Sequence, residues 1–221
     1  MWALRHCAVV VAGVAVLSLV APASAGMVDL GGGWQASWDA ALDGLVMVNA
    51  VEVRGDALFI QKSAEFKDPP VAGAFSPLEI LFEQTDPDAV SHVVIDDEII
   101  ANSCGTDWTD FTFGVDAPAV FDPAATANSG GAGPIGFTIA PFTTGVFGAG
   151  DTRLDVTGGT VPDGGLWFPG NGITDGQLWI NITLDPQGGT SWTLIETPVP
   201  EPATLGLLAA GGGLLLARRR R

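Results

Sequence analysis

Two aspartates three positions apart, Asp107 and Asp110, are the first candidates for metal ligands in this sequence. They lie in or beside a polar turn that also contains Asn102, Gly105 and Thr106, so several side-chain oxygens are close together along the chain. Calcium prefers carboxylate and amide oxygens, although the spacing does not match an EF-hand loop. We therefore consider a calcium site at Asp107 and Asp110, with a solvated acidic surface as the alternative.

A tryptophan is the first candidate for binding a sugar. In the run Leu178–Leu184 every second side chain is Leu or Ile, which places Trp179 on the opposite face of a strand. An exposed indole on a β-sandwich can stack on a sugar ring, and it can equally pack beneath a loop or a second sheet. Trp179 therefore marks a possible contact with an extracellular polysaccharide, and packing remains the competing interpretation.

Histidine and cysteine are too few for the commonest hydrolytic and zinc sites. His92 is the only histidine and Cys104 the only cysteine beyond residue 25. A Ser-His-Asp or Cys-His arrangement would have to use His92, which no nucleophile motif accompanies, and one histidine with one cysteine does not fill a zinc site. Paired carboxylates of a glycosidase remain open, because their separation is a property of the fold. The sequence predicts a protein that is not an enzyme and, calcium apart, has no cofactor.

The charge of the chain excludes other partners. The 221-residue chain has a net charge of −16, and between Gly26 and Pro200 there are 24 acidic side chains against four basic ones, a net charge of −20. Nucleic acid and anionic lipid headgroups would be repelled by such a surface. A single cysteine in this region also forbids an internal disulfide, so stability must come from the core.

The first 25 residues have the pattern of a secretory signal peptide. Arg5 supplies a positive start, Ala8–Val20 is uncharged and apolar, and Ala23, Ser24 and Ala25 form a small-x-small cleavage site. Cleavage is expected between Ala25 and Gly26. The mature protein is therefore predicted to be exported.

The segment 26–197 has the pattern of one all-β domain. Short runs rich in Val, Ile, Phe and Thr alternate with Gly, Pro and Asp clusters, and no helical periodicity persists for three turns. Nine strands are predicted: Leu45–Val53, Ala57–Gln61, Leu78–Glu83, Ser91–Ala101, Phe111–Asp116, Ile135–Ala140, Arg153–Thr157, Leu178–Leu184 and Ser191–Glu196. This count fits a single antiparallel β-sandwich, with the jelly roll as one candidate topology. The last two strands are expected to pair as a hairpin through Asp185–Gly189.

The chain ends in three consecutive parts that make up the tail, 198–221. Pro198, Pro200 and Pro202 alternate and favour an extended segment. Residues 203–217 carry no charge and would form a helix of about 22 Å, short for a bilayer core of roughly 30 Å. Arg218, Arg219, Arg220 and Arg221 follow and are expected to stop transfer on the cytoplasmic side of the membrane.

The tail resembles a known sorting signal. Val199, Pro200, Glu201 and Pro202, an apolar run and a terminal arginine cluster are similar to the PEP-CTERM tail of exported bacterial proteins. The resemblance implies recognition by an exosortase, a membrane cysteine protease and transpeptidase, in a Gram-negative type of envelope. It also implies removal of the apolar run and delivery to the cell surface or the extracellular matrix.

The resemblance assigns no activity to the domain before the tail. We expect a structural or interaction protein of the cell envelope, held in the membrane by its C-terminal helix until it is processed. A carbohydrate-binding module is the alternative, and a glycan-active enzyme is a weaker one.

Overall fold

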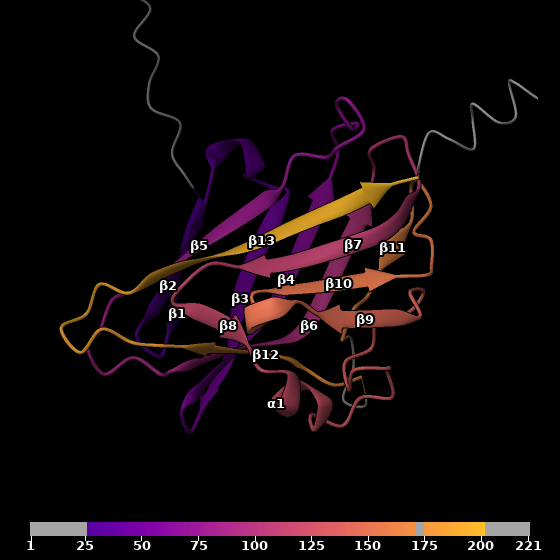
Figure 1. Ribbon diagram of the computed structural model, residues 1–221. Helices are drawn as coiled ribbons and strands as arrows, with labels where there is room; N and C mark the ends of the chain where they lie inside the picture. The colour runs from indigo at the N-terminus through magenta and orange to yellow at the C-terminus, as the bar shows by residue number, and fades with distance from the viewer. Residues whose placement is uncertain (1–25, 171–174, 202–221) are drawn as a thin grey trace, which may run out of the picture.

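The alternating segments of the sequence form two β-sheets that enclose a common hydrophobic core (Figure 1). This computed structural model describes residues 26–170 and 175–201. The predicted signal peptide, Pro202, the apolar run 203–217 and the four terminal arginines lie outside these residues. Among the described residues, no helix is long and apolar enough to cross a membrane.

One sheet has seven strands. Its spatial order is β1 (Gly26–Gly31), β2 (Trp34–Trp38), β5 (Leu78–Gln84), β13 (Ser191–Pro200), β7 (Trp108–Val115), β10 (Arg153–Thr157) and β9 (Thr144–Phe147). All neighbouring strands in it are antiparallel. The last strand of the chain therefore lies at the centre of this sheet, with β5 on one side and β7 on the other.

The facing sheet is built mostly from the first half of the chain. Its spatial order is β3 (Val46–Arg54), β4 (Ala57–Phe66), β6 (His92–Asn102), β12 (Leu178–Ile182) and β8 (Ala119–Phe121), and β11 (Leu166–Trp167) also pairs with β6. Three short helices lie in the connections: η1 (Ala40–Leu42), α1 (Pro123–Ala127) and η2 (Ala149–Asp151). The strands of the two sheets cross in the view of Figure 1.

The prediction of an all-β fold is confirmed, but the prediction that all pairs are antiparallel is wrong. Strands β4 and β6 run parallel, from Ala57 opposite His92 to Phe66 opposite Asn102. The chain between them passes through β5 in the other sheet, and this excursion supplies the long crossover that a parallel pair needs. The six-stranded sheet is therefore mixed, which departs from the antiparallel Greek keys of a jelly roll.

The predicted hairpin between Leu178–Leu184 and Ser191–Glu196 is also wrong. Strand β12 pairs with β6 and β8, whereas β13 pairs with β5 and β7 in the other sheet. The segment Asp185–Gly189 therefore crosses from one sheet to the other. Alternation correctly identified both strands, but it reports which face of a strand is buried and not which strand lies beside it.

The predicted strand Ile135–Ala140 is absent from the described residues, where this segment forms turns. Phe137 and Ile139 are nevertheless fully buried, so their alternation comes from a loop that covers one end of the core. Gly136 has a φ of 77°, which interrupts an extended backbone. The segments that became β1, β2, β8, β9 and β11 were not predicted as strands.

Aromatic rings fill the centre of the core. Phe111 lies between Trp167 and Phe113, with ring centroids 4.9 and 5.0 Å away, and Trp108 lies 5.9 Å from it. All four side chains are fully buried or nearly so. Such edge-to-face and tilted contacts stabilise a core beyond the area that they bury. They supply the packing that is required by the described part of the chain, where Cys104 is free.

Candidate functional site

Strand β13 carries the chain from the centre of the fold into the tail. It extends four residues beyond the predicted end at Glu196, because Pro198, Val199 and Pro200 still pair with β7. Strand β5 stops pairing with β13 at Glu196, so one edge of β13 is open from there on, and an open edge tolerates proline. Pro198 is buried, whereas Val199 and Glu201 are exposed.

Aspartates near the end of β13 hold the adjacent loops together. The carboxylate of Asp107 accepts a hydrogen bond from the backbone N–H of Asp163 at 2.8 Å, and the carboxylate of Asp163 accepts one from Gly105 at 2.8 Å. Asp110 lies on β7 opposite Val199. Within residues 26–170 and 175–201, no group of three or more His, Cys, Asp or Glu side chains is placed to share a metal ion. Asp107 therefore has a structural role, and calcium at Asp107 and Asp110 stays a prediction.

Trp179 points away from the main core, as its strand pattern predicts. On the outer face of the six-stranded sheet it joins a small apolar cluster with Ala57, Phe59 and Val94. Its ring lies edge-on to Phe59, with centroids 5.9 Å apart, and to His92, with centroids 6.0 Å apart. The indole is half-buried in these contacts. These contacts are with side chains of the same sheet, and sugar stacking on Trp179 stays a prediction.

His92 has a serine and an aspartate beside it that the sequence did not point to. The Ser91 hydroxyl lies 3.0 Å from His92 Nδ1 and 2.6 Å from a carboxylate oxygen of Asp56. The hydrogen bonds from Ser91, from its hydroxyl first and then from its backbone N–H, hold the pKa of Asp56 below its usual value. In a catalytic triad the histidine stands between the nucleophile and the carboxylate. Here serine contacts the carboxylate directly, so the three residues form a surface hydrogen-bonded cluster.

A charged cluster that the sequence reading missed lies between the two sheets. Lys62 of β4, Glu98 of β6 and Glu196 of β13 are buried, with side-chain exposures of 0%. Lys62 Nζ contacts Glu98 and lies 2.6 and 2.8 Å from the two carboxylate oxygens of Glu196. Lys62 shares the inward face of β4 with Ile60 and Ala64, so a charged residue on an apolar face was the signal that could have revealed it.

Burial controls the protonation of this cluster. Burial in the core, followed by the negative charge of Glu196, raises the pKa of Glu98 well above its usual value despite the opposing effect of Lys62. Burial alone would lower the pKa of Lys62, but the two facing carboxyl groups more than offset this and raise it. The raised pKa values favour the charged form of Lys62 and the neutral form of Glu98, and a proton on Glu98 removes the excess negative charge from the core.

Comparison with family models identifies the end of the chain. Residues 198–221 match the model described as the PEP-CTERM protein-sorting motif. The chain carries this sorting motif. The PEP-CTERM motif implies an exported, envelope-associated protein that is sorted through an exosortase, a membrane protease. Searches of the curated proteins and of the solved structures each found no match.

The PEP-CTERM motif and the fold overlap. The motif begins at Pro198, whereas β13 ends at Pro200, so the first three residues of the motif pair with β7. The backbone N–H of Glu201 also donates a hydrogen bond of 3.4 Å to the carbonyl of Asp107. The recognition segment therefore starts inside the sheet, without an intervening linker.

Proposed function

We propose that this protein is a structural or interaction component of the bacterial cell surface or extracellular matrix, delivered and cut through its PEP-CTERM tail. The observation that carries the proposal is the sorting motif joined directly to the central strand of a folded β domain. The net charge of −20 between Gly26 and Pro200 supports a role in a hydrated extracellular setting.

Mass spectrometry of the protein from the envelope and from the medium tests this proposal. The mature chain should begin near Gly26 and end close to Val199–Pro202. Detection of the intact Arg218–Arg221 end in the extracellular form would overturn the processing step.

A matched pair of variants tests recognition of the motif. Glu201→Gln changes the exposed acid of the motif and should leave unprocessed precursor in the membrane fraction. Glu52→Gln changes an exposed acid on β3 and should be processed normally. Equal processing of both variants would show that Glu201 is not recognised.

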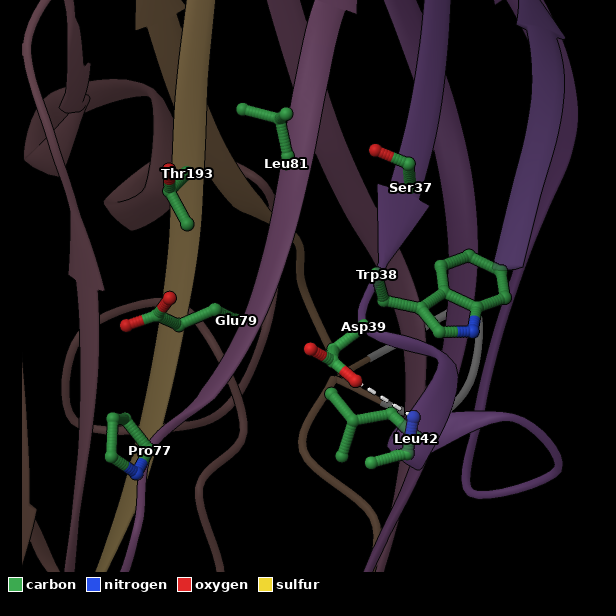
Figure 2. Close-up of a pocket in the computed structure, with 9 residues that line it drawn as sticks. Ser37, Trp38, Asp39, Leu42, Pro77, Glu79, Leu81 and Thr193 are labelled. Carbon is green, nitrogen blue, oxygen red and sulfur yellow. Dashed lines mark hydrogen bonds between the residues drawn. The ribbon is translucent and has the colours of Figure 1, made fainter. Parts of the chain in front are cut away.

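Carbohydrate binding is a second candidate function, favoured by a hollow on the outer face of the seven-stranded sheet. The hollow has a volume of about 580 Å³ and lies over β2, β5 and β13. Figure 2 shows Trp38, Asp39 and Leu42 on one side of it and Pro77, Glu79 and Thr193 on the other. An aromatic ring, apolar side chains and a few oxygen-bearing groups are the mixture that sugars bind.

A glycan array distinguishes this hollow from Trp179. The mature protein should bind a glycan that Trp38→Ala and Glu79→Gln no longer bind, while Trp179→Ala, as the matched control, still does. Loss of binding only in Trp179→Ala would move the site to the six-stranded sheet. Absence of any glycan ligand would leave the structural role alone.

A further inference from the structure

The buried cluster of Lys62, Glu98 and Glu196 joins the two sheets at their common core. Glu98 lies directly beside Lys62 in the parallel pair of β4 and β6. Glu196 reaches the same point from β13 of the facing sheet. Any bond between Lys62 and Glu196 would therefore fasten the two layers of the sandwich to each other.

The contacts within the cluster leave some of its buried carboxyl oxygens without a hydrogen bond. Two carboxyl groups share one ammonium group, and Glu98 Oε2 and Glu196 Oε1 are buried without a hydrogen-bond partner among the described residues. Oε1 of Glu196 lies 2.6 Å from Lys62 Nζ, yet without the alignment of a hydrogen bond. Buried polar atoms are normally paired, so each exception needs an explanation.

The same contacts suit a reaction between the two side chains. Nζ lies 2.6 and 2.8 Å from the two oxygens of Glu196, and a nitrogen so placed is within roughly 3 Å of the carboxyl carbon between them. This is the separation of a near-attack arrangement, but a nitrogen that contacts both oxygens lies near the plane of the carboxyl group, so Nζ must move above that plane before it can attack the carbon. The surrounding core excludes bulk water, which would otherwise compete as a nucleophile.

We propose that Lys62 and Glu196 become joined by an amide bond between Nζ and Cδ, with Glu98 as the proton carrier. The ammonium group first passes a proton to a Glu196 oxygen, which leaves a neutral amine and a neutral acid as a minor state, since the two carboxyl groups favour the ammonium form. The amine attacks Cδ, and the protonated Glu98 gives its proton to the departing hydroxyl group. One water molecule leaves, and Glu98 recovers a proton from the nitrogen. The C–O bond breaks as the N–C bond forms, and no oxidant, reductant or cofactor is needed.

An amide is less costly to bury in this core than the separate ammonium and carboxylate groups. Ammonium and carboxylate are replaced by a neutral amide, so no charge remains to be desolvated in the core. Glu98, whose pKa is raised, stays protonated and can donate a hydrogen bond to the new carbonyl. The bond would also link β4 to β13 in an exported protein whose only cysteine beyond the predicted signal peptide, Cys104, is buried and free.

The intact mass of the mature protein, measured after denaturation, tests the bond directly. The expected mass is one water molecule below the sum of its residues. Trypsin should no longer cut after Lys62, because an acylated lysine is not a substrate. The peptide from Gly55 to Lys67 should then be found joined to the peptide that begins at Leu154 and contains Glu196.

Other outcomes of this measurement would overturn the proposal. A full mass with normal cleavage after Lys62 would show a buried ion cluster only. A link to the peptide that contains Glu98 and ends at Arg153 would show that Lys62 is joined to Glu98 and not to Glu196. A mass deficit of one water molecule can also arise at an Asp-Gly sequence such as Asp163-Gly164. Trypsin would then still cut after Lys62, and this result would overturn the proposal.

Two variants test the part that Glu98 plays. Glu98→Gln keeps the shape of the side chain but cannot carry a proton, so its mass should be full and cleavage after Lys62 restored. Glu52→Gln removes an exposed carboxyl group on β3 and should keep the bond. A bond that still forms in Glu98→Gln would remove Glu98 from the mechanism. The mass of the native protein by itself shows whether the bond exists. The proposal can therefore be refuted even if a variant does not fold.

Discussion

Replacing Glu98 by glutamine should abolish a specific pH dependence of the stability of this protein. The pKa of Glu98 is raised in the folded state because burial disfavours its charged form. In the unfolded chain the group titrates near the ordinary value of 4.5. Above that pH the unfolded state loses the proton while the folded state keeps it, so stability falls as pH rises toward the raised pKa.

The size of the effect follows from one proton. A difference of one bound proton between the two states changes the free energy of unfolding by about 1.4 kcal/mol per pH unit. Between the ordinary value of 4.5 and the raised pKa of Glu98, the native protein should therefore lose stability with this slope as pH rises, whereas Glu98→Gln should not. Asp56 and Asp122 have lowered pKa values, so their contributions are lost only as pH falls below about 4.

Urea unfolding followed by tryptophan fluorescence at several pH values measures this difference. The slope of stability against pH is compared between the native protein and Glu98→Gln, which is safer than comparing absolute stabilities. Glu79→Gln, which removes an exposed carboxyl group, should keep the native slope. Identical slopes in the native protein and in Glu98→Gln would refute the assignment of a neutral carboxyl group to the core.

Three further predictions concern other residues. Lys62→Met removes the partner of two buried carboxyl groups, as an ammonium group and also as the proposed amide, and should lower the free energy of unfolding by at least about 3–5 kcal/mol in urea titrations. Lys67→Met, at an exposed ion pair, should cost less than about 1 kcal/mol, and equal losses would contradict the buried cluster. Cys104 is 4% exposed, so a thiol reagent should label it only after denaturation, and rapid labelling of the native protein would be incompatible with the fold. Asp107→Ala should lower the melting temperature in metal-free buffer through the lost bond to Asp163, whereas a calcium-dependent rise seen in the native protein and absent from Asp107→Ala would establish the calcium site.

The strands of this fold were largely predictable because alternation depends only on which face is buried. Strand β10 was predicted with both of its ends, Arg153 and Thr157, and β12 with its buried and outward faces. The end of β13 was placed too early, since its prolines argue against a central strand. They are tolerated because β5 has already ended beside them.

The partners of the strands were not predictable in the same way. A period of two does not say whether β12 and β13 pair with each other or lie in opposite sheets. Candidate sites can likewise be predicted only where their residues are close together in the sequence. The sorting motif is a property of consecutive residues and was read correctly, whereas Lys62, Glu98 and Glu196 are distant in sequence and meet only in the folded core.

The place of β13 in its sheet also determines when the domain can fold. Of the described strands it is the last to be synthesised, yet it occupies the middle of the seven-stranded sheet, so β5 and β7 have no neighbour between them until it arrives. Only two residues, Glu201 and Pro202, separate its end from the apolar run. In an exported chain, completion of the sheet must therefore wait until β13 itself has crossed the membrane. Once β13 pairs with β5 and β7, the folded sheet opposes backward movement of the chain.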